Sequence, residues 1–397
     1  MPTDTVNLTI ALDARAMHSA RRRGTGKNLV DLYRRVLELR PHWRVIGYHR
    51  GGANPLADVP GYQPRGIEMV GDRFDAWQRW RLPMAAWRDG AHVLHCPANT
   101  CPSVLPMPTL LTVHDLLPLE AGGMAASRFR RSVRTAVRRG LSIITPSQFT
   151  AEELTQRFGA SPEQVVVNAW AADGAMHHVT DGSALSALRE RYGLGEGPVV
   201  LHMGASDARK NTRRVVEAFA ELPEAIRRRW TLLVIGIECA AQRAELERLA
   251  GACGAAGAIR VRGFADEADM PALLSVSQVL AYPSLGEGFG LPVLDAFAAR
   301  CAVLTSRCSS LPEVAGDAAY YVQPGSLASV SEGLARMLSD AALRAELVER
   351  GAARLGHFTW QRTAARFAGA VERTVQRRAV GRACFREGMA EAKHAAA

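Results

Sequence analysis

The chain has 397 residues, 48% of them hydrophobic and 22% charged, which is long enough for two domains with substantial cores and typical of a globular protein. It contains no run of about eighteen or more apolar residues, so we expect no membrane-spanning helix. Residues 1–15 lack the basic and apolar segments of a secretory signal peptide, so we expect a cytoplasmic protein.

The formal net charge of +10 favours polyanionic partners, namely nucleotides, nucleic acid or an anionic membrane. No helix-turn-helix, zinc-finger or RNA-binding signature occurs, which argues against nucleic acid. The seven cysteines include no Cys-x-x-Cys pair and fit neither a zinc site nor a disulfide framework. Arginines recur at helical spacing within 127–140. This segment is either a solvated helix face or a surface that rests on anionic lipid at the inner face of the membrane.

The first half of the chain alternates short apolar runs with helical patterns, as parallel βα units do. Strands are expected at residues 8–12, 43–48, 91–96, 109–114 and 141–145. A loop at 19–27 precedes an amphipathic helix over 28–39, which ends before Pro41. A further helix begins at Ser147, whose hydroxyl suits an N-cap.

The second half repeats this alternation, beyond a polar and glycine-rich stretch at 180–198. Strands are expected at residues 199–204, 230–236, 259–264, 279–283, 302–305 and 319–322. One helix is expected over 211–222, and Pro292 suits the first turn of another that runs to about residue 299. We therefore predict an α/β protein with two Rossmann-like, doubly wound domains. Their ligands should bind beyond the carboxyl ends of the strands, in a central cleft between the domains.

The stretch SLGEGFGLPVLD (284–295) follows one of these strands and carries two acids, Glu287 and Asp295. Its glycines allow a ligand to approach the backbone, and the N–H groups of Phe289, Gly290 and Leu291 open a helix, which favours phosphate. The acids can contact two parts of one elongated ligand. An ordinary strand–turn–helix connection is the alternative. The GxGxG spacing does not match a dinucleotide-binding fingerprint.

Two cations, Arg209 and Lys210, stand where another strand leads into a helix. Paired cations beside a helix start suit a diphosphate. The alternative is a surface turn with two solvated charges.

These motifs resemble those of family 4 of the retaining glycosyltransferases, which have the GT-B fold. That family shows an acid, seven residues and a second acid after a glycine-rich turn, and an Arg-Lys-Asn motif about eighty residues earlier. Segments 309–324 and 358–367 match the family as well. Looser matches lie in the first half, at residues 13–15, 23–27, 113–119 and 145–150.

The resemblance implies a role for each matching residue. Arg209 and Lys210 would bind the donor diphosphate and stabilise the leaving nucleotide. Glu287 would contact hydroxyls of the transferred sugar, assisted by the backbone amides at 289–291. Asp295 stands where the family has a second Glu that grips the ribose, and being shorter it implies a closer helix or a bridging water.

Further roles follow from the looser matches. Gly263 and Phe264 end the strand whose backbone usually hydrogen-bonds the base. Gly24 and Gly26 would cap the donor phosphate or the acceptor side. His114 would lie near the reacting centre, although a structural histidine at the end of an apolar strand is a rival interpretation. Where the family often has Cys-Gly, this chain has Arg300 and Cys301, and we expect the arginine to adopt a less strained turn.

The resemblance implies a metal-independent enzyme with no cofactor, and no DxD motif is present to hold a metal. Cleavage of a sugar–phosphate bond leaves an oxocarbenium-like sugar and a diphosphate with extra negative charge, which two cations and a helix N-terminus would stabilise. A retaining glycosidase would instead need two carboxylates across the scissile bond. In the family, the acceptor attacks on the face from which the diphosphate leaves.

The predicted function is a retaining hexosyltransferase that uses a nucleotide sugar, with a preference for GDP-mannose. Its acceptor would be a growing glycan or a lipid-linked glycan in the assembly of a cell-surface polysaccharide or lipopolysaccharide. Two alternatives stay open: an epimerase or phosphorylase of the same fold, and a nucleotide-binding module without catalysis. The predicted domains are an N-terminal acceptor-side domain, a linker, a C-terminal donor domain, a helix that crosses back and a flexible tail, at 1–180, 181–197, 198–355, 356–385 and 386–397.

Overall fold

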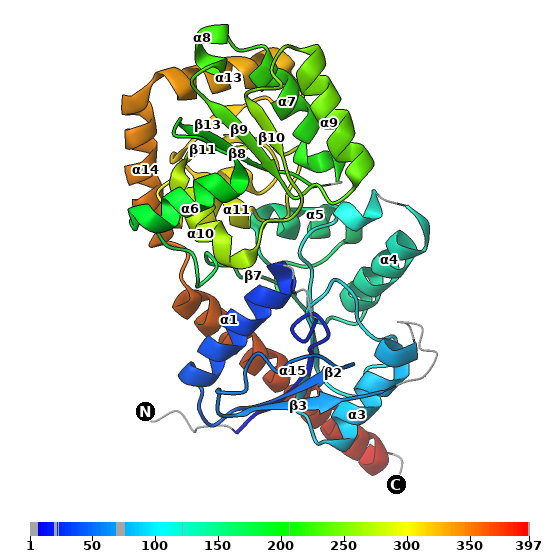
Figure 1. Ribbon diagram of the computed structural model, residues 1–397. Helices are drawn as coiled ribbons and strands as arrows, with labels where there is room; N and C mark the ends of the chain where they lie inside the picture. Colours follow the sequence, from blue (N-terminus) through cyan, green and yellow to red (C-terminus); the bar gives the residue numbers. More distant parts are fainter. Residues whose placement is uncertain are drawn as a thin grey trace. The chain divides into compact units, whose positions relative to one another are not determined.

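The computed structural model describes residues 7–19, 22, 24–68, 76–120, 122–205 and 207–395, with side chains up to residue 377. The chain folds as two compact units. Residues up to Trp170 and the helix α15 (Trp360–Ala395) form the first unit, and Ala171–Thr359 forms the second (Figure 1). The boundary therefore lies at Trp170 rather than at residue 180.

The first unit contains a parallel sheet in the order β3-β2-β1-β4-β5-β6-β7. Its strands are β1 (Thr9–Asp13), β2 (Arg44–His49), β3 (Tyr62–Gly66), β4 (Val93–Cys96), β5 (Thr109–Thr112), β6 (Ser142–Thr145) and β7 (Val165–Val167). The register pairs Ile10 with Val45 on one side and with Val93 on the other. The sequence predicts all of these strands except β3 and β7, the two edges. Pro64 in β3 cannot donate to a ladder, so its strand is confined to an edge and lacks an apolar pattern.

The helices of this unit follow the predicted alternation. They are α1 (Gly24–Leu39), the π-helical turn η1 (Trp77–Arg81), α3 (Leu82–Arg88), the 3₁₀ turn η2 (Leu117–Leu119), α4 (Gly123–Arg138) and α5 (Gln148–Phe158). Ser147 caps α5 as predicted, because its hydroxyl accepts a hydrogen bond from the N–H of Thr150. Helix α1 begins at Gly24 and not at residue 28. A Cβ on Gly26 would lie 2.3 Å from the carbonyl oxygen of Ala16, so a glycine is needed within this helix turn and does not mark a loop.

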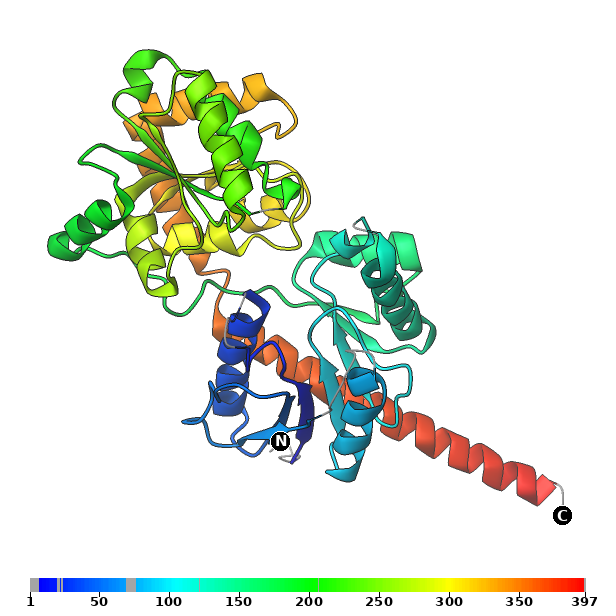
Figure 2. The same ribbon diagram turned by 45° about the vertical axis from the view of Figure 1, so that its right-hand side comes forward.

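Helix α15 packs on the first unit and closes its core. Phe367 meets Tyr33 of α1 edge-on, and the hydroxyl of Thr374 donates to that of Ser142 in β6 at 2.7 Å. The helix is continuous to Ala395, so residues 386–395, which we expected to be a flexible tail, belong to it (Figure 2). Residues 396 and 397 lie outside the described part of the chain.

The second unit contains a parallel sheet in the order β10-β9-β8-β11-β12-β13. Its strands are β8 (Val199–Met203), β9 (Thr231–Ile235), β10 (Ile259–Val261), β11 (Ser277–Tyr282), β12 (Ala302–Ser306) and β13 (Ala319–Val322). All six were predicted, and the interpretation of two doubly wound α/β domains is confirmed. Strand β10 is shorter than expected, so Gly263 and Phe264 lie in the loop beyond it.

Helices cover both faces of this second sheet (Figure 1). They are α6 (Gly182–Tyr192), α7 (Thr212–Ala220), α8 (Glu224–Arg227), α9 (Ala240–Ala252), α10 (Met270–Val276), α11 (Leu291–Ala298), α12 (Leu311–Ala315), α13 (Leu327–Ser339) and α14 (Ala341–Leu355), with 3₁₀ turns η3 (Ala208–Lys210) and η4 (Glu267–Asp269). Residues 181–197, expected as a linker, include α6, which packs within the unit. Arg191 and Tyr192 at its end both bind the carboxylate of Asp269, at 2.6 and 2.9 Å.

Candidate functional site

The carboxyl ends of β8 and β11 bring together the two motifs of the second half. The two strands are parallel neighbours, with Leu201 paired to Leu280. The loop after β8 carries Arg209, and the loop after β11 carries Glu287. The N–H of Leu285 donates to the carbonyl of Arg209 at 2.8 Å, which joins these loops directly. Residue 206 of the first loop lies outside the described residues.

Lys210 and Glu287 form an ion pair inside this loop cluster. The Lys210 Nζ lies 2.9 Å from Glu287 Oε1, and only 20% and 11% of the two side chains are exposed. The Tyr282 hydroxyl donates to the same Oε1 at 2.8 Å and also contacts Lys210 Nζ. Burial raises the pKa of Tyr282 well above its usual value, so the phenol stays protonated and acts as a donor. Glu287 Oε1 is therefore held from two sides.

Arg209 is oriented by its own loop and by the glycine-rich turn. Its Nε lies 2.8 Å from Asp207 Oδ2, and its Nη1 donates to the carbonyl of Gly286 at 3.1 Å. Burial works to raise the pKa of Asp207, but hydrogen bonds from Arg209 outweigh it and hold that pKa below its usual value. The guanidinium group of Arg209 thus lies beside the turn, and a bound anion would contact it together with the Asp207 carboxylate.

The loops keep this shape through side-chain contacts to the backbone. Asn211 has a φ of 59°, and its side-chain amide donates to the carbonyls of Pro283 and Pro324 at 3.1 and 2.8 Å. The Ser309 hydroxyl accepts from the N–H of Glu287, and the Ser310 hydroxyl lies 2.9 Å from the Glu287 carbonyl oxygen. The backbone around the acid is therefore held by the side chains of Asn211, Ser309 and Ser310.

The glycine-rich turn leads into α11 as predicted. Gly290 has a φ of 116°, and a Cβ there would lie 2.9 Å from Leu311 Cδ2. Leu291 opens the helix, with Pro292 in its first turn. Phe289 is buried and meets Phe358 edge-on. The first N–H groups of a helix have no intrahelical partner, so this end of α11 can bind an anion.

Asp295 lies one turn inside α11 and has a protein partner. Its Oδ1 accepts a hydrogen bond from the backbone N–H of Asp173 at 3.1 Å. The carboxylate therefore fastens the segment after Trp170 to this helix, and its contact with a ribose stays a prediction. At the end of the helix, Arg300 has a φ of 58°, in the left-handed region, so the expectation of a less strained turn was wrong.

Gly263 and Phe264 follow the edge strand β10. The Gly263 carbonyl accepts a hydrogen bond from the N–H of Gly236 at 2.8 Å. This bond joins the loop that follows β9 to the loop that follows β10. The Phe264 ring is 60% exposed, which leaves an aromatic face available for stacking.

The remaining predicted site residues belong to the first unit. His114 lies beyond β5, its Nε2 bonds the carbonyl of Pro97 at 2.7 Å, and its ring stacks on Trp170. Since a carbonyl only accepts, Nε2 carries the proton, and burial lowers the pKa of the ring. Gly24 is exposed at the start of α1, and Gly26 is buried within it. Residue 23 of the same motif lies outside the described residues.

Sequence reasoning missed several residues of the site, namely Asp207, Tyr282, Ser309 and Ser310. Asp207 was detectable as an acid two residues before a cation, and Tyr282 as a polar tip at the end of an apolar strand. The two serines open the segment 309–324 that matches the family, but nothing in the sequence indicated their contacts with Glu287. Among the described residues, no group of three or more His, Cys, Asp or Glu side chains could hold a metal ion.

Comparisons with known proteins define the class. Residues 186–354 match the model of the group 1 glycosyl transferases, and residues 23–168 match that of glycosyltransferase family 4. The structure resembles Anabaena HepE, solved with UDP and glucose, with a TM-score of 0.73 at 17% identity over 92% of this chain and 100% of that one. It also resembles WaaG, a glycosyltransferase involved in lipopolysaccharide biosynthesis, with a TM-score of 0.70 at 17% identity over 91% of this chain and 98% of that one. These likenesses show a GT-B fold.

Curated relatives share more sequence with the chain. It is 30% identical to O-antigen chain mannosyltransferase B of Escherichia coli over 55% of this chain and 57% of the relative. It is 28% identical to the serotype-specific mannosyltransferase WbdA of the same species, over 66% of this chain and 33% of that protein. The match thus spans between a third and just over half of these relatives. The two family models together cover most of the chain, which therefore carries both a group 1 and a family 4 glycosyltransferase domain.

Within the described residues, no helix is both long enough and apolar enough to cross a bilayer.

Proposed function

We propose that this protein is a retaining, metal-independent glycosyltransferase that needs no cofactor. It transfers a hexosyl group from a nucleotide sugar to a growing or lipid-linked glycan in the assembly of a cell-surface polysaccharide. It works in the cytoplasm, in peripheral contact with the inner face of the membrane through residues 127–140. GDP-mannose is the proposed donor.

One observation carries the proposal: two cations and an ordered acid converge where β8 and β11 end, beside the start of α11. A departing nucleoside diphosphate gains negative charge, which Arg209, Lys210 and the amides at the helix start would stabilise. Because both hydrogen bonds between the Glu287 carboxylate and described residues fall on Oε1, its Oε2 would receive a sugar hydroxyl. Phe264 would stack on the base, and Asp295 would bind the ribose.

The choice of mannose is supported by the two relatives described above, which are both mannosyltransferases by name. Another relative is a 2-deoxystreptamine glucosyltransferase, and the HepE structure holds UDP and glucose, so the base must be tested. A thermal-shift screen against GDP, UDP, ADP and dTDP decides it, because a ligand that binds only the folded state raises stability by an amount that grows with the logarithm of its affinity. A shift with UDP alone would replace GDP-mannose.

The catalytic roles are tested by transfer assays with the donor so identified. Arg209→Ala and Lys210→Ala should each lower kcat by about two orders of magnitude, since each removes a charged contact to the leaving group. Arg213→Ala is the matched control, because Arg213 pairs with Glu217 and Glu245 on the surface. Near-normal turnover in both variants would overturn these roles.

The chemistry has its own tests. NMR of the product should show the anomeric configuration of the donor, and EDTA should leave the rate unchanged; an inverted product or loss of activity with EDTA would contradict the proposal. Incubation with donor alone separates the alternatives, because an epimerised nucleotide sugar would identify an epimerase of the same fold.

A further inference from the structure

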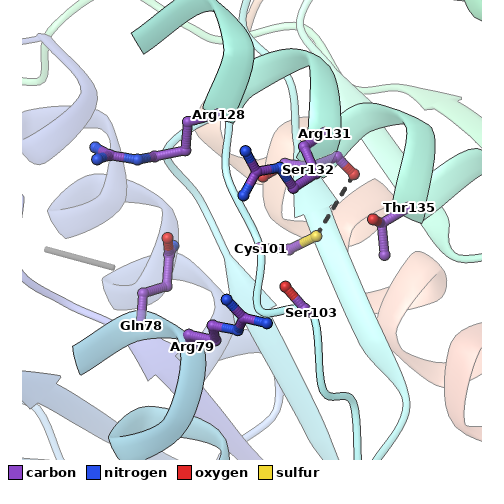
Figure 3. Close-up of a pocket in the computed structure, with 8 residues that line it drawn as sticks. All are labelled: Gln78, Arg79, Cys101, Ser103, Arg128, Arg131, Ser132 and Thr135. Atoms are coloured by element: carbon purple, nitrogen blue, oxygen red, sulfur yellow. Dashed lines mark hydrogen bonds between the residues drawn. The ribbon is translucent and has the colours of Figure 1, made fainter. Parts of the chain in front are cut away.

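A small pocket in the first unit is unexplained by the transfer chemistry. It lies between η1 and the first half of α4, with a volume of about 70 Å³. Arg79 enters it from η1, and Arg128 and Arg131 enter it from α4. Ser103 and Thr135 add hydroxyl groups to its wall. Figure 3 shows the guanidinium groups of Arg79 and Arg131 on either side of Cys101 and Ser103.

The argument for an anion rests on Arg79 and Arg131, whose guanidinium groups lie on either side of Cys101 and Ser103. No acidic side chain in the described part of the chain forms an ion pair with Arg79 or Arg131. Burial raises the pKa of Cys101 to about 12, so this thiol stays uncharged. Asp13, which reaches Gln78 at 3.4 Å, is already paired with Arg15 at 2.6 Å.

The packing of α4 divides its arginines into two sets. The helix buries Phe129 and Val133 against the core, which places Arg128 and Arg131 on the flank that faces η1. Arg130 and Arg134 do not line the pocket, although Arg131 is exposed as they are. The basic stretch therefore contains two arginines that line the pocket, Arg128 and Arg131, and two that do not, Arg130 and Arg134.

An apolar stripe lies next to the pocket on η1 and α3. Trp80, Met84 and Trp87 are 51%, 39% and 59% exposed, at the spacing of one helix face. Tryptophan with neighbouring arginine is typical of helices that rest in the headgroup region of a bilayer. The stripe is therefore suited to rest on a lipid surface beside the pocket.

We propose that the pocket of Arg79, Arg128 and Arg131 binds a phosphate group. Guanidinium forks match the oxygen geometry of phosphate, and three of them around a small volume favour an anion of high charge. Such a group is carried by membrane lipid headgroups and by lipid-linked glycans, as well as by soluble phosphates. Its assignment to the acceptor rests on the proposed function, whereas the pocket itself is tested by binding alone.

The first arm of the test is calorimetric titration of the full chain with inorganic pyrophosphate, in the presence of a saturating concentration of the nucleotide that the thermal-shift screen selects. That nucleotide occupies the phosphate site of the second unit. Arg131→Gln and Arg79→Gln should each weaken pyrophosphate binding by about tenfold, the effect of one lost charge-assisted hydrogen bond. Arg130→Gln is the matched control, with the same charge loss on the same helix. Equal pyrophosphate affinities of the wild type and the three variants would overturn the proposed phosphate site. So would equal losses of affinity in Arg130→Gln and Arg131→Gln.

The second arm uses flotation with vesicles of phosphatidylglycerol, compared with phosphatidylcholine. If the phosphate belongs to a lipid, Arg128→Gln/Arg131→Gln should lower binding to the anionic vesicles at least about tenfold more than Arg130→Gln/Arg134→Gln does. Pyrophosphate binding with no vesicle difference supports the pocket and assigns it a soluble ligand. Absence of both effects overturns it. Donor hydrolysis without acceptor should be unchanged in these variants, so a failed pocket and a failed transferase are distinguished.

Discussion

The ion pair of Lys210 and Glu287 should make these two residues depend on each other for stability. Lys210→Met leaves a largely buried carboxylate without its cation, and Glu287→Gln leaves a largely buried ammonium without its anion. The double variant has neither charge. We therefore expect both single variants to be destabilised and the double variant to lose less than their sum.

The magnitude follows from the geometry. Two unit charges 2.9 Å apart attract by about 6 kcal/mol at an effective dielectric constant near 20, and lost hydration offsets most of this. A hydrogen bond to a charged group has a net value of about 1.5–3 kcal/mol. Each single substitution should therefore lower the free energy of unfolding by about 2 kcal/mol, with a coupling energy of about 1.5–3 kcal/mol between them.

The assay must report on this unit alone. Trp230 is the single tryptophan of Ala171–Thr359 and is buried in its core. Fluorine NMR of protein labelled with 5-fluorotryptophan, followed through urea unfolding, resolves its signal, and Trp230→Phe assigns it. The exposed pair of Arg213 and Glu217 serves as the control cycle, with an expected coupling below about 0.5 kcal/mol. Strictly additive losses at Lys210 and Glu287 would refute the reasoning.

Three further changes test other parts of the structure. Gly351→Ala should destabilise the protein by about 2 kcal/mol, because the new Cβ would lie 2.5 Å from the Phe297 ring. Gly251→Ala, in open space on α9, should instead stabilise the protein by about 0.5–1 kcal/mol. Urea unfolding measures both free energies, and equal effects of the two substitutions would contradict this packing. Burial lowers the pKa of His202 to about 4, so the unfolded chain, with a histidine pKa near 6.5, takes up the proton first as the pH falls. The free energy of unfolding should therefore drop by about 2 kcal/mol from this residue between pH 7 and 5, and His202→Gln should remove that part of the slope; an unchanged slope would refute it. Asp295→Asn keeps an acceptor for the backbone N–H bound by this side chain, so it should match the wild type in stability while Asp295→Ala loses about 1 kcal/mol. If the Asp295 carboxylate contacts the ribose, Asp295→Asn should weaken nucleotide binding in thermal-shift assays more than Asp295→Glu does. Equal nucleotide affinities of these two variants would exclude that contact.

Much of the fold was determined by local patterns in the sequence. The inner strands of both sheets are covered on both faces, so they need apolar residues at nearly every position and are visible as apolar runs. Ser147 and Pro292 marked helix starts through their own side-chain chemistry. The edge strand β3 was not predicted, since four of its five residues are exposed and Pro64 breaks its pattern.

The candidate site was determined in part by sequence. Motif spacing selected Arg209, Lys210 and Glu287, because the loops after parallel strands gather at one edge of a sheet. It did not reveal that Lys210 and Glu287 touch, nor that Tyr282 shares the contact, since these depend on β8 and β11 being neighbours. Strand order is decided by how the connecting helices pack, which no local pattern records.

Only the tertiary structure decided the details that rest on close approach between distant segments. The sequence pattern assigns Gly26 to a loop, whereas in the structure it lies in helix α1, where the nearby carbonyl oxygen of Ala16 leaves no room for a Cβ. Likewise, the basic stretch of α4 became a pocket only when η1 placed Arg79 opposite Arg131. Local sequence sets which face of a helix is apolar, but what that face meets depends on the burial of the whole unit. For this reason the sequence specified the strands and the chemistry at their ends, and the packed chain specified which charges share a site.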